Sequence, residues 1–132
     1  GPDMLDFAFS AHSGWRYMVL LVGLLTALYA LVGLIRKGPV DKAGLGLLRG
    51  FGIVVDIQFL LGILTLLSRP FYSALIGHLV LMVAAIAVVH LGAVRMKKLP
   101  PEQRTWGMLL MSSLIPLALM IGGILSIQRP II

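Results

Sequence analysis

The chain has 132 residues, of which 59% are hydrophobic and only 12% are charged, and it contains no cysteine. A soluble domain carries about a quarter charged residues, so most of this surface must face lipid rather than water. The lack of cysteine excludes disulfides, thiolate metal sites and thiol nucleophiles. The net charge of +6 does not indicate nucleic-acid binding, because the cations lie in short segments between apolar runs, without the interleaved aromatic residues that such binding needs.

Four apolar runs follow one another, each close to the roughly 20 residues that a helix needs to cross a bilayer core of about 30 Å. The predicted spans cover about 15–35, 47–67, 71–94 and 106–127. Short connections make successive helices antiparallel, so we predict an all-α, up-down-up-down four-helix transmembrane bundle, with residues 1–132 as one domain. Residues 5–13 read as a semi-polar lead-in to the first span, and residues 1–3 as the remnant of a cleaved tag.

The basic residues predict the orientation of the bundle. The connection after the first span, extended to Arg49, holds four Lys or Arg residues, and so does the connection after the third span, extended to Arg104. The opposite side has only Arg16, Arg69 and Arg129. Since Lys and Arg are concentrated in cytoplasmic loops, we expect a multi-pass protein with both termini outside the cytoplasm.

Ionisable residues inside a span are costly and are therefore candidates for function. His12 and Arg16 are four residues apart, so they share a face at the outer end of the first helix. His78 lies about six residues, or roughly 9 Å, below the outer interface. Two neutral imidazoles with an arginine nearby suit a haem, whose iron they ligate while the arginine pairs with a propionate. We predict one haem b per chain with His78 and His12 as metal ligands; an interfacial role for His12 and an interhelical hydrogen bond for His78 are the alternatives.

Asp56 and His90 lie at a similar depth on the second and third spans. We expect a buried carboxylate–imidazole pair, because pairing offsets part of the cost of burying either group. Its role would be a proton relay, the orientation of a ligating histidine, or the fixing of helix register. His78 and His90 are twelve residues apart, about 120° around a helix, which favours one haem over two. If His12 lies too far from His78, the other ligand would be Met82, His90 from a second subunit, or absent.

Four stretches together resemble a known family. They are His12-Ser-Gly-Trp-Arg-Tyr17, Gln58-Phe-Leu-Leu-Gly62, Gly77-His-Leu-Val-Leu-Met82 and His90-Leu-Gly-Ala-Val-Arg95. The set resembles small four-helix bacterial membrane proteins labelled cytochrome b, and is more distantly similar to the four-helix halves of haem A synthase. The resemblance implies a b-type haem and a role in electron transfer or haem handling, and His12, His78 and His90 match the family's histidines. Asp56 departs from it, because relatives carry a histidine two residues before the glutamine, and this leaves His90 without a partner for a second haem.

The expected function is therefore that of a haem-binding electron carrier in the bacterial cytoplasmic membrane, exchanging electrons with a quinone or a respiratory complex. As an enzyme it would be a haem-dependent component of a membrane oxidoreductase, in monomeric or homodimeric form. Two alternatives stay open: a proton-conducting, ion-conducting or transport protein that uses Asp56 and His90, and a non-catalytic accessory subunit of a membrane complex. Nucleophile-elbow, phosphate-loop and dinucleotide-binding motifs are missing from the sequence.

Overall fold

The computed structural model describes residues 2–68 and 70–127, with side chains from residue 6 onward. Its elements are α1 (Pro2–Arg36), α2 (Lys42–Ser68), α3 (Ala74–Lys98), the 3-10 turn η1 (Pro101–Gln103) and α4 (Trp106–Ser126). Within the described residues, each of the four α-helices contains a segment long and apolar enough to cross a membrane. The predicted all-α four-helix architecture of a multi-pass membrane protein is confirmed.

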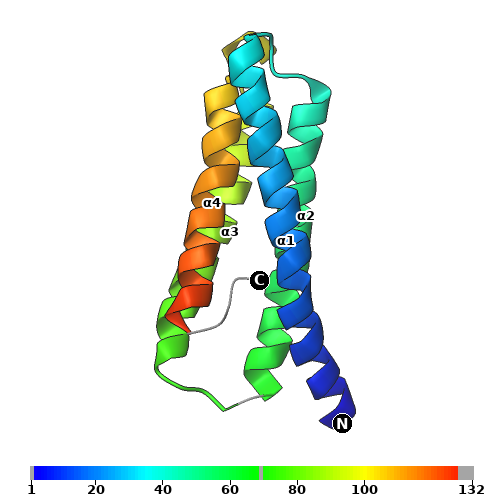
Figure 1. Cartoon of the computed structure of the whole chain (residues 1–132), viewed down its shortest axis with the longest axis vertical. Helices are drawn as coiled ribbons and strands as arrows, with labels where there is room; N and C mark the ends of the chain where they lie inside the picture. The colour runs from blue at the N-terminus through cyan, green and yellow to red at the C-terminus, as the bar shows by residue number, and fades with distance from the viewer. Residues whose placement is uncertain (1, 69, 128–132) are drawn as a thin grey trace.

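The helices run alternately up and down around a common axis (Figure 1). α1 packs against α2 and α4, and α3 packs against α4 and less extensively against α2. The described parts of α1 and α3 make no close backbone approach to each other, so these two helices are diagonal in the bundle. We call the end with the α1–α2 and α3–α4 connections the basic end, and the end where α1 begins and α4 stops the termini end.

Two helices begin earlier than the apolar runs predict. α1 starts at Pro2 and carries His12 inside a continuous helix rather than in a lead-in, and proline is well tolerated in the first turn of a helix. α2 starts at Lys42, and the Asp41 carboxylate accepts a hydrogen bond of 2.8 Å from the Gly44 N–H. Such an N-cap satisfies one of the free donors at a helix start. Hydrophobicity alone therefore marks the membrane segment and not the whole helix.

The interior is densely packed nearer the basic end. Phe51, Leu48 and Leu109 are almost wholly buried. The Trp106 indole lies on Gly33 of α1, where an added Cβ would come within 2.1 Å of the ring, and its Nε1–H donates to the Gly38 carbonyl at 2.7 Å. Small residues let helices approach closely in lipid, where burial from water does not drive packing. The outer surface is rich in exposed leucine, isoleucine and valine, as expected where lipid replaces water.

Candidate functional site

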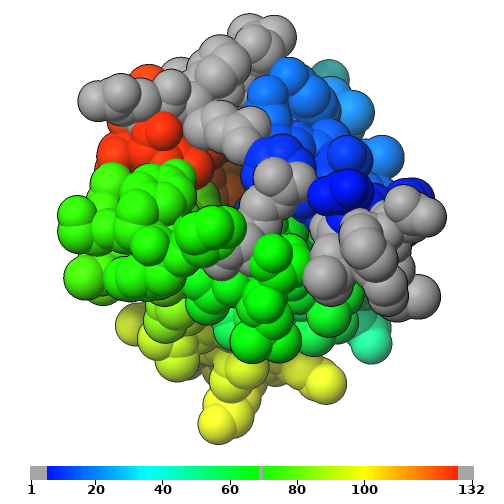
Figure 2. Space-filling model, turned by 90° about the horizontal axis from the view of Figure 1, so that it is seen from below, coloured from blue at the N-terminus to red at the C-terminus, as the bar shows by residue number. Residues whose placement is uncertain are grey.

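A cavity of about 490 Å³ lies toward the termini end, between all four helices. Figure 2 looks onto this end, where the starts of α1 and α3 and the ends of α2 and α4 surround the centre of the bundle. Six polar residues of the helices line the cavity: His12, Ser13, Arg16, Gln58, Thr65 and His78. Most of the remaining wall is apolar. The volume lies within the range of about 300–1,000 Å³ that is usual for small-molecule and cofactor sites.

His78 on α3 has one ring nitrogen committed to the protein. Its Nδ1 lies 2.9 Å from the carbonyl oxygen of Gly123 on α4. A carbonyl only accepts hydrogen bonds, so Nδ1 must be the donor, and the tautomer with its proton on Nδ1 has its lone pair on Nε2. Histidines that ligate metals are commonly oriented by such a bond from the other nitrogen. An added Cβ on the neighbouring Gly77 would meet nothing within 4 Å, but Gly77 is exposed and does not line the cavity.

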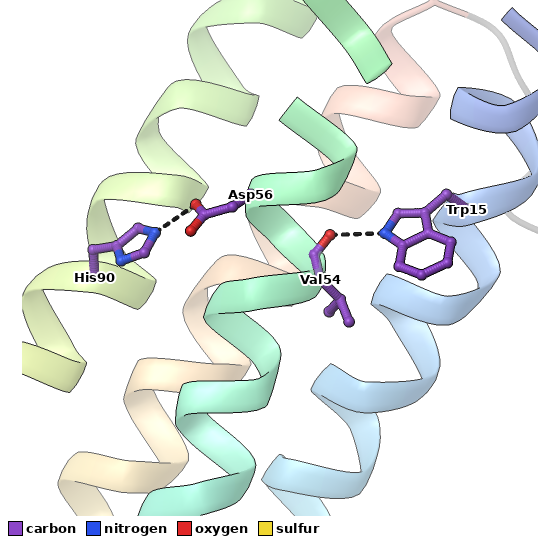
Figure 3. Close-up of polar contacts among 4 residues, drawn as sticks. All are labelled: Trp15, Val54, Asp56 and His90. Atoms are coloured by element: carbon purple, nitrogen blue, oxygen red, sulfur yellow. Dashed lines mark hydrogen bonds and ion pairs between the residues drawn. The ribbon is translucent and has the colours of Figure 1, made fainter. Parts of the chain in front are cut away.

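His12 lies on the opposite wall, and its helix is tied to α2 at this level. Its ring packs on Gly62, where an added Cβ would lie 3.0 Å from the imidazole Cε1. The Gln58 side chain donates to the His12 carbonyl at 2.8 Å. One turn further along α1, the Trp15 Nε1–H donates to the Val54 carbonyl, also at 2.8 Å (Figure 3). These contacts fix the height of His12 relative to α2.

Both histidines lie far from the basic end of the bundle. Measured from the basic end along each helix, His12 lies about 36 Å from Arg36 and His78 about 30 Å from Lys98, at 1.5 Å per residue. Both histidines therefore lie in the half of the bundle at the termini end, where they line the same cavity. Because α1 and α3 are diagonal, the cavity lies between them.

Arg16 is held at the cavity wall by its own helix. One guanidinium nitrogen donates to the Ser13 carbonyl at 2.7 Å and to the Ser13 hydroxyl at 3.2 Å. The other donates to the Tyr17 hydroxyl at 2.7 Å. The Nε of Arg16 is buried and has no hydrogen-bond partner among the described residues. No aspartate or glutamate is among the described residues that line the cavity, so none of these residues neutralises the guanidinium.

Asp56 and His90 do interact, as the sequence predicts: the His90 Nε2–H donates to the Asp56 carboxylate at 2.7 Å (Figure 3). The expected burial is wrong, because the His90 and Asp56 side chains are 46% and 52% exposed. Asp56 projects from α2 toward α3, on the side away from the Val54 carbonyl that faces α1 (Figure 3). α2 and α3 also pack less extensively against each other than α2 packs against α1 or α3 packs against α4. The pair therefore lies on the outer surface. Neither residue lines the cavity that contains His12 and His78, which we call the histidine cavity.

Two contributions to the site are absent from the sequence predictions. The first is the Gly123 carbonyl, which orients His78. Glycine has no side chain that could indicate such a role, and only the adjacent pair Gly122 and Gly123 indicates that another helix can approach α4 closely there. Gly62 is the second, since it leaves room for the His12 ring. Met82, considered as a ligand from the sequence, lines the cavity, and its methyl group lies where a Cβ on Gly123 would stand.

No family model matches the chain, and no match was found among curated proteins or solved structures. Among the described residues, no cluster of three or more histidine, cysteine, aspartate or glutamate side chains is arranged to hold a bare metal ion. A haem requires fewer protein ligands than a bare ion, because the porphyrin supplies four nitrogens and the protein only axial groups. Two imidazoles that line one cavity match in number the axial donors that a haem takes from a protein.

Proposed function

We propose that this chain binds one b-type haem in the cavity between α1 and α3 and acts in membrane electron transfer or haem handling. His78 and His12 would be the axial ligands, and Arg16 would pair with a propionate. The haem would supply an iron that changes between two oxidation states. A quinone or a respiratory complex would exchange electrons with it.

One observation carries the proposal: histidines from two diagonal helices line one largely apolar cavity, with an arginine beside them. The contact of His78 with the Gly123 carbonyl adds support, because it leaves Nε2 as the available nitrogen. With both axial positions held by the protein, oxygen and other small ligands would be kept from the iron, as suits an electron carrier. Apolar walls would exclude water and help set the reduction potential.

The orientation is part of the proposal. Both basic connections are at one end of the bundle (Figure 1), and Lys and Arg accumulate on the cytoplasmic side. We place the basic end in the cytoplasm of a bacterial cell and the histidine cavity toward the outer face of its cytoplasmic membrane. The Arg69 and Arg129 of the sequence prediction lie outside the described residues.

Absorption spectra test the proposal directly. Protein purified from haem-replete cells should show a Soret band that shifts when dithionite reduces it. His78→Ala should abolish this band, whereas His90→Ala, which changes a histidine outside the cavity, should leave it largely intact. Wild-type protein without a Soret band would refute the haem proposal, and equal loss in both variants would refute the assignment of the ligands.

The contact between Asp56 and His90 favours a second candidate, a proton-conducting or transport protein. A carboxylate and an imidazole 2.7 Å apart inside the segments that cross the membrane are the groups that proton relays use. Proton flux into reconstituted vesicles should then occur and be abolished by Asp56→Asn. Haem-free protein with such a flux would favour this candidate over the first.

A further inference from the structure

A second hollow lies at the basic end, between α2 and α3. Its volume is about 450 Å³, and it shares no lining residue with the histidine cavity. Leu48 and Met96 form part of its wall and are themselves each 1% exposed. Gly46 also lines it, and an added Cβ there would meet nothing within 4 Å. This hollow, which we call the basic groove, is therefore open to a ligand of headgroup size.

Four cations line the basic groove, from three parts of the chain. They are Lys42 and Arg49 of α2, Lys97 of α3, and Arg104 just before α4. Arg104 is held in place, because its Nε donates to the carbonyl of the neighbouring Met96 at 2.6 Å and its Nη2 to the carbonyl of Lys97 at 3.2 Å. The described lining contains no aspartate or glutamate. The groove thus concentrates positive charge at one point.

The nearest carboxylates on α2 and its connection are engaged elsewhere. Asp41, beside Lys42, accepts hydrogen bonds from the Tyr29 hydroxyl and the Gly44 N–H. Asp56 lies seven residues beyond Arg49, about 10 Å along the helix, and binds His90. The cations of the groove are therefore not neutralised from these positions, and an external anion would complete the site.

We infer that the basic groove binds the headgroup phosphate of an anionic phospholipid. Lys42 begins α2 and Lys97 lies in the last turn of α3, so the groove is at the level where membrane-spanning helices end and headgroups lie. Basic pockets between such helices on the cytoplasmic side bind acidic lipid headgroups, and arginine pairs with phosphate through parallel hydrogen bonds.

The surface beside the groove favours a lipid over a free phosphate. Val94 lines the groove and is 48% exposed, and Leu91, one turn toward the membrane centre on α3, is 69% exposed. On α2, Ile53 lies one turn from Arg49 toward the membrane centre and is 53% exposed. Acyl chains would cover this apolar strip, whereas a soluble anion would leave it uncovered. This inference rests on the groove and on the proposed orientation of the basic end, but not on the proposed haem.

Native mass spectrometry of delipidated protein in detergent, titrated with phosphatidylglycerol or phosphatidylcholine, tests the inference. One phosphatidylglycerol should bind in preference to phosphatidylcholine. The double variant Arg49→Gln/Lys97→Gln should weaken its binding on the order of 30-fold, at roughly 5-fold for each lost cation. The matched control Arg36→Gln/Lys98→Gln removes the same charges at the same end but outside the groove, and should weaken binding less than about 5-fold.

A size variant separates the shape of the groove from its charge. Gly46→Leu would fill the groove without changing charge and should reduce phosphatidylglycerol binding, whereas Gly50→Leu, at an equally open glycine outside the groove, should not. Millimolar inorganic phosphate, at constant ionic strength, should leave lipid binding unchanged. Three results would each overturn the inference: equal binding of the two lipids, equal losses in the two double variants, or displacement of the lipid by phosphate. The comparison of the two lipids uses wild-type protein, so it tests the inference even if a variant does not fold.

Discussion

The indole ring of Trp106, at the start of α4, packs so closely against α1 that Gly33 has no room for a side chain. An added Cβ would lie 2.1 Å from Trp106 Cδ2. The same indole donates to the Gly38 carbonyl at 2.7 Å and contacts the Tyr29 ring edge-on, with centroids 5.7 Å apart. Three elements, α1, the α1–α2 connection and α4, are thus joined at the basic end through one side chain.

Gly33→Ala should destabilise the bundle by about 1–3 kcal/mol, because a rigid ring in a packed interface cannot move aside without shifting α4. Gly50→Ala is the control, since nothing lies within 4 Å of its added Cβ and alanine is favoured over glycine inside a helix by about 0.5–1 kcal/mol. Unfolding in mixed micelles, followed by circular dichroism, measures both. A Gly33→Ala variant as stable as Gly50→Ala would show that the Trp106 contact is loose.

The contact between Asp56 and His90 should appear as an energetic coupling. Asp56→Asn and His90→Gln should each destabilise the protein, and the double variant should be less harmful than the sum by about 0.5–1 kcal/mol, because partners in contact are not additive. Asp56→Asn combined with His78→Gln serves as the control, since His78 binds Gly123 instead, and these effects should add. Strict additivity for Asp56 and His90 would show that their hydrogen bond contributes nothing measurable.

The sequence predicted the helices better than their contacts. Long apolar runs and basic connections determine the number and order of the helices, since few structures satisfy backbone groups in lipid. The interaction of Asp56 and His90 was predicted because both lie at a similar depth in the membrane. Depth does not show which face of a helix a residue occupies, so the exposure of the pair was not predicted. The Gly123 carbonyl could not be predicted, because any residue offers one.

Asp41 should make stability depend on acid pH. Its pKa is lowered, first by the hydrogen bond from the Tyr29 hydroxyl and then by that from the Gly44 N–H. A lowered pKa in the folded state means that the stabilisation is complete above the ordinary value near pH 4 and is lost as the pH falls through the folded value. Thermal unfolding should therefore occur at lower temperature below about pH 4, and Asp41→Asn should reduce this dependence.

The same aspartate acts as an N-cap, which gives a second readout. Asp41→Ala should cost about 1 kcal/mol at neutral pH, whereas Asp41→Asn should cost less, because asparagine also caps helices well. Glu102→Gln removes a carboxylate from η1 at the same end and should leave neutral-pH stability unchanged. If Asp41→Ala unfolds like the wild type, the hydrogen bond to Gly44 does not stabilise the start of α2.

The proposed orientation can be tested with single cysteines, since the chain has none of its own. A cysteine at Ser10 in α1, near the termini end, should react with an impermeant thiol reagent in intact cells. A cysteine at Lys98, the last residue of α3, should react only after the cells are lysed. Labelling of position 98 alone in intact cells would reverse the proposed topology and place the histidine cavity toward the cytoplasm.

His12 can be distinguished from the other candidate sixth ligands by chemical rescue. If His78 and His12 both hold the haem, His12→Ala should keep most of the haem, because His78 stays oriented by the Gly123 carbonyl, but its spectrum should change to that of a haem with one open axial position. Added imidazole should restore the wild-type spectrum by entering the space that the His12 ring occupies beside Gly62. Met82→Leu is the control, because Met82 also lines the cavity and leucine has a similar volume but no sulfur. This variant should leave the spectrum unchanged. A His12→Ala spectrum identical to that of the wild type, together with an altered Met82→Leu spectrum, would assign the sixth position to methionine instead.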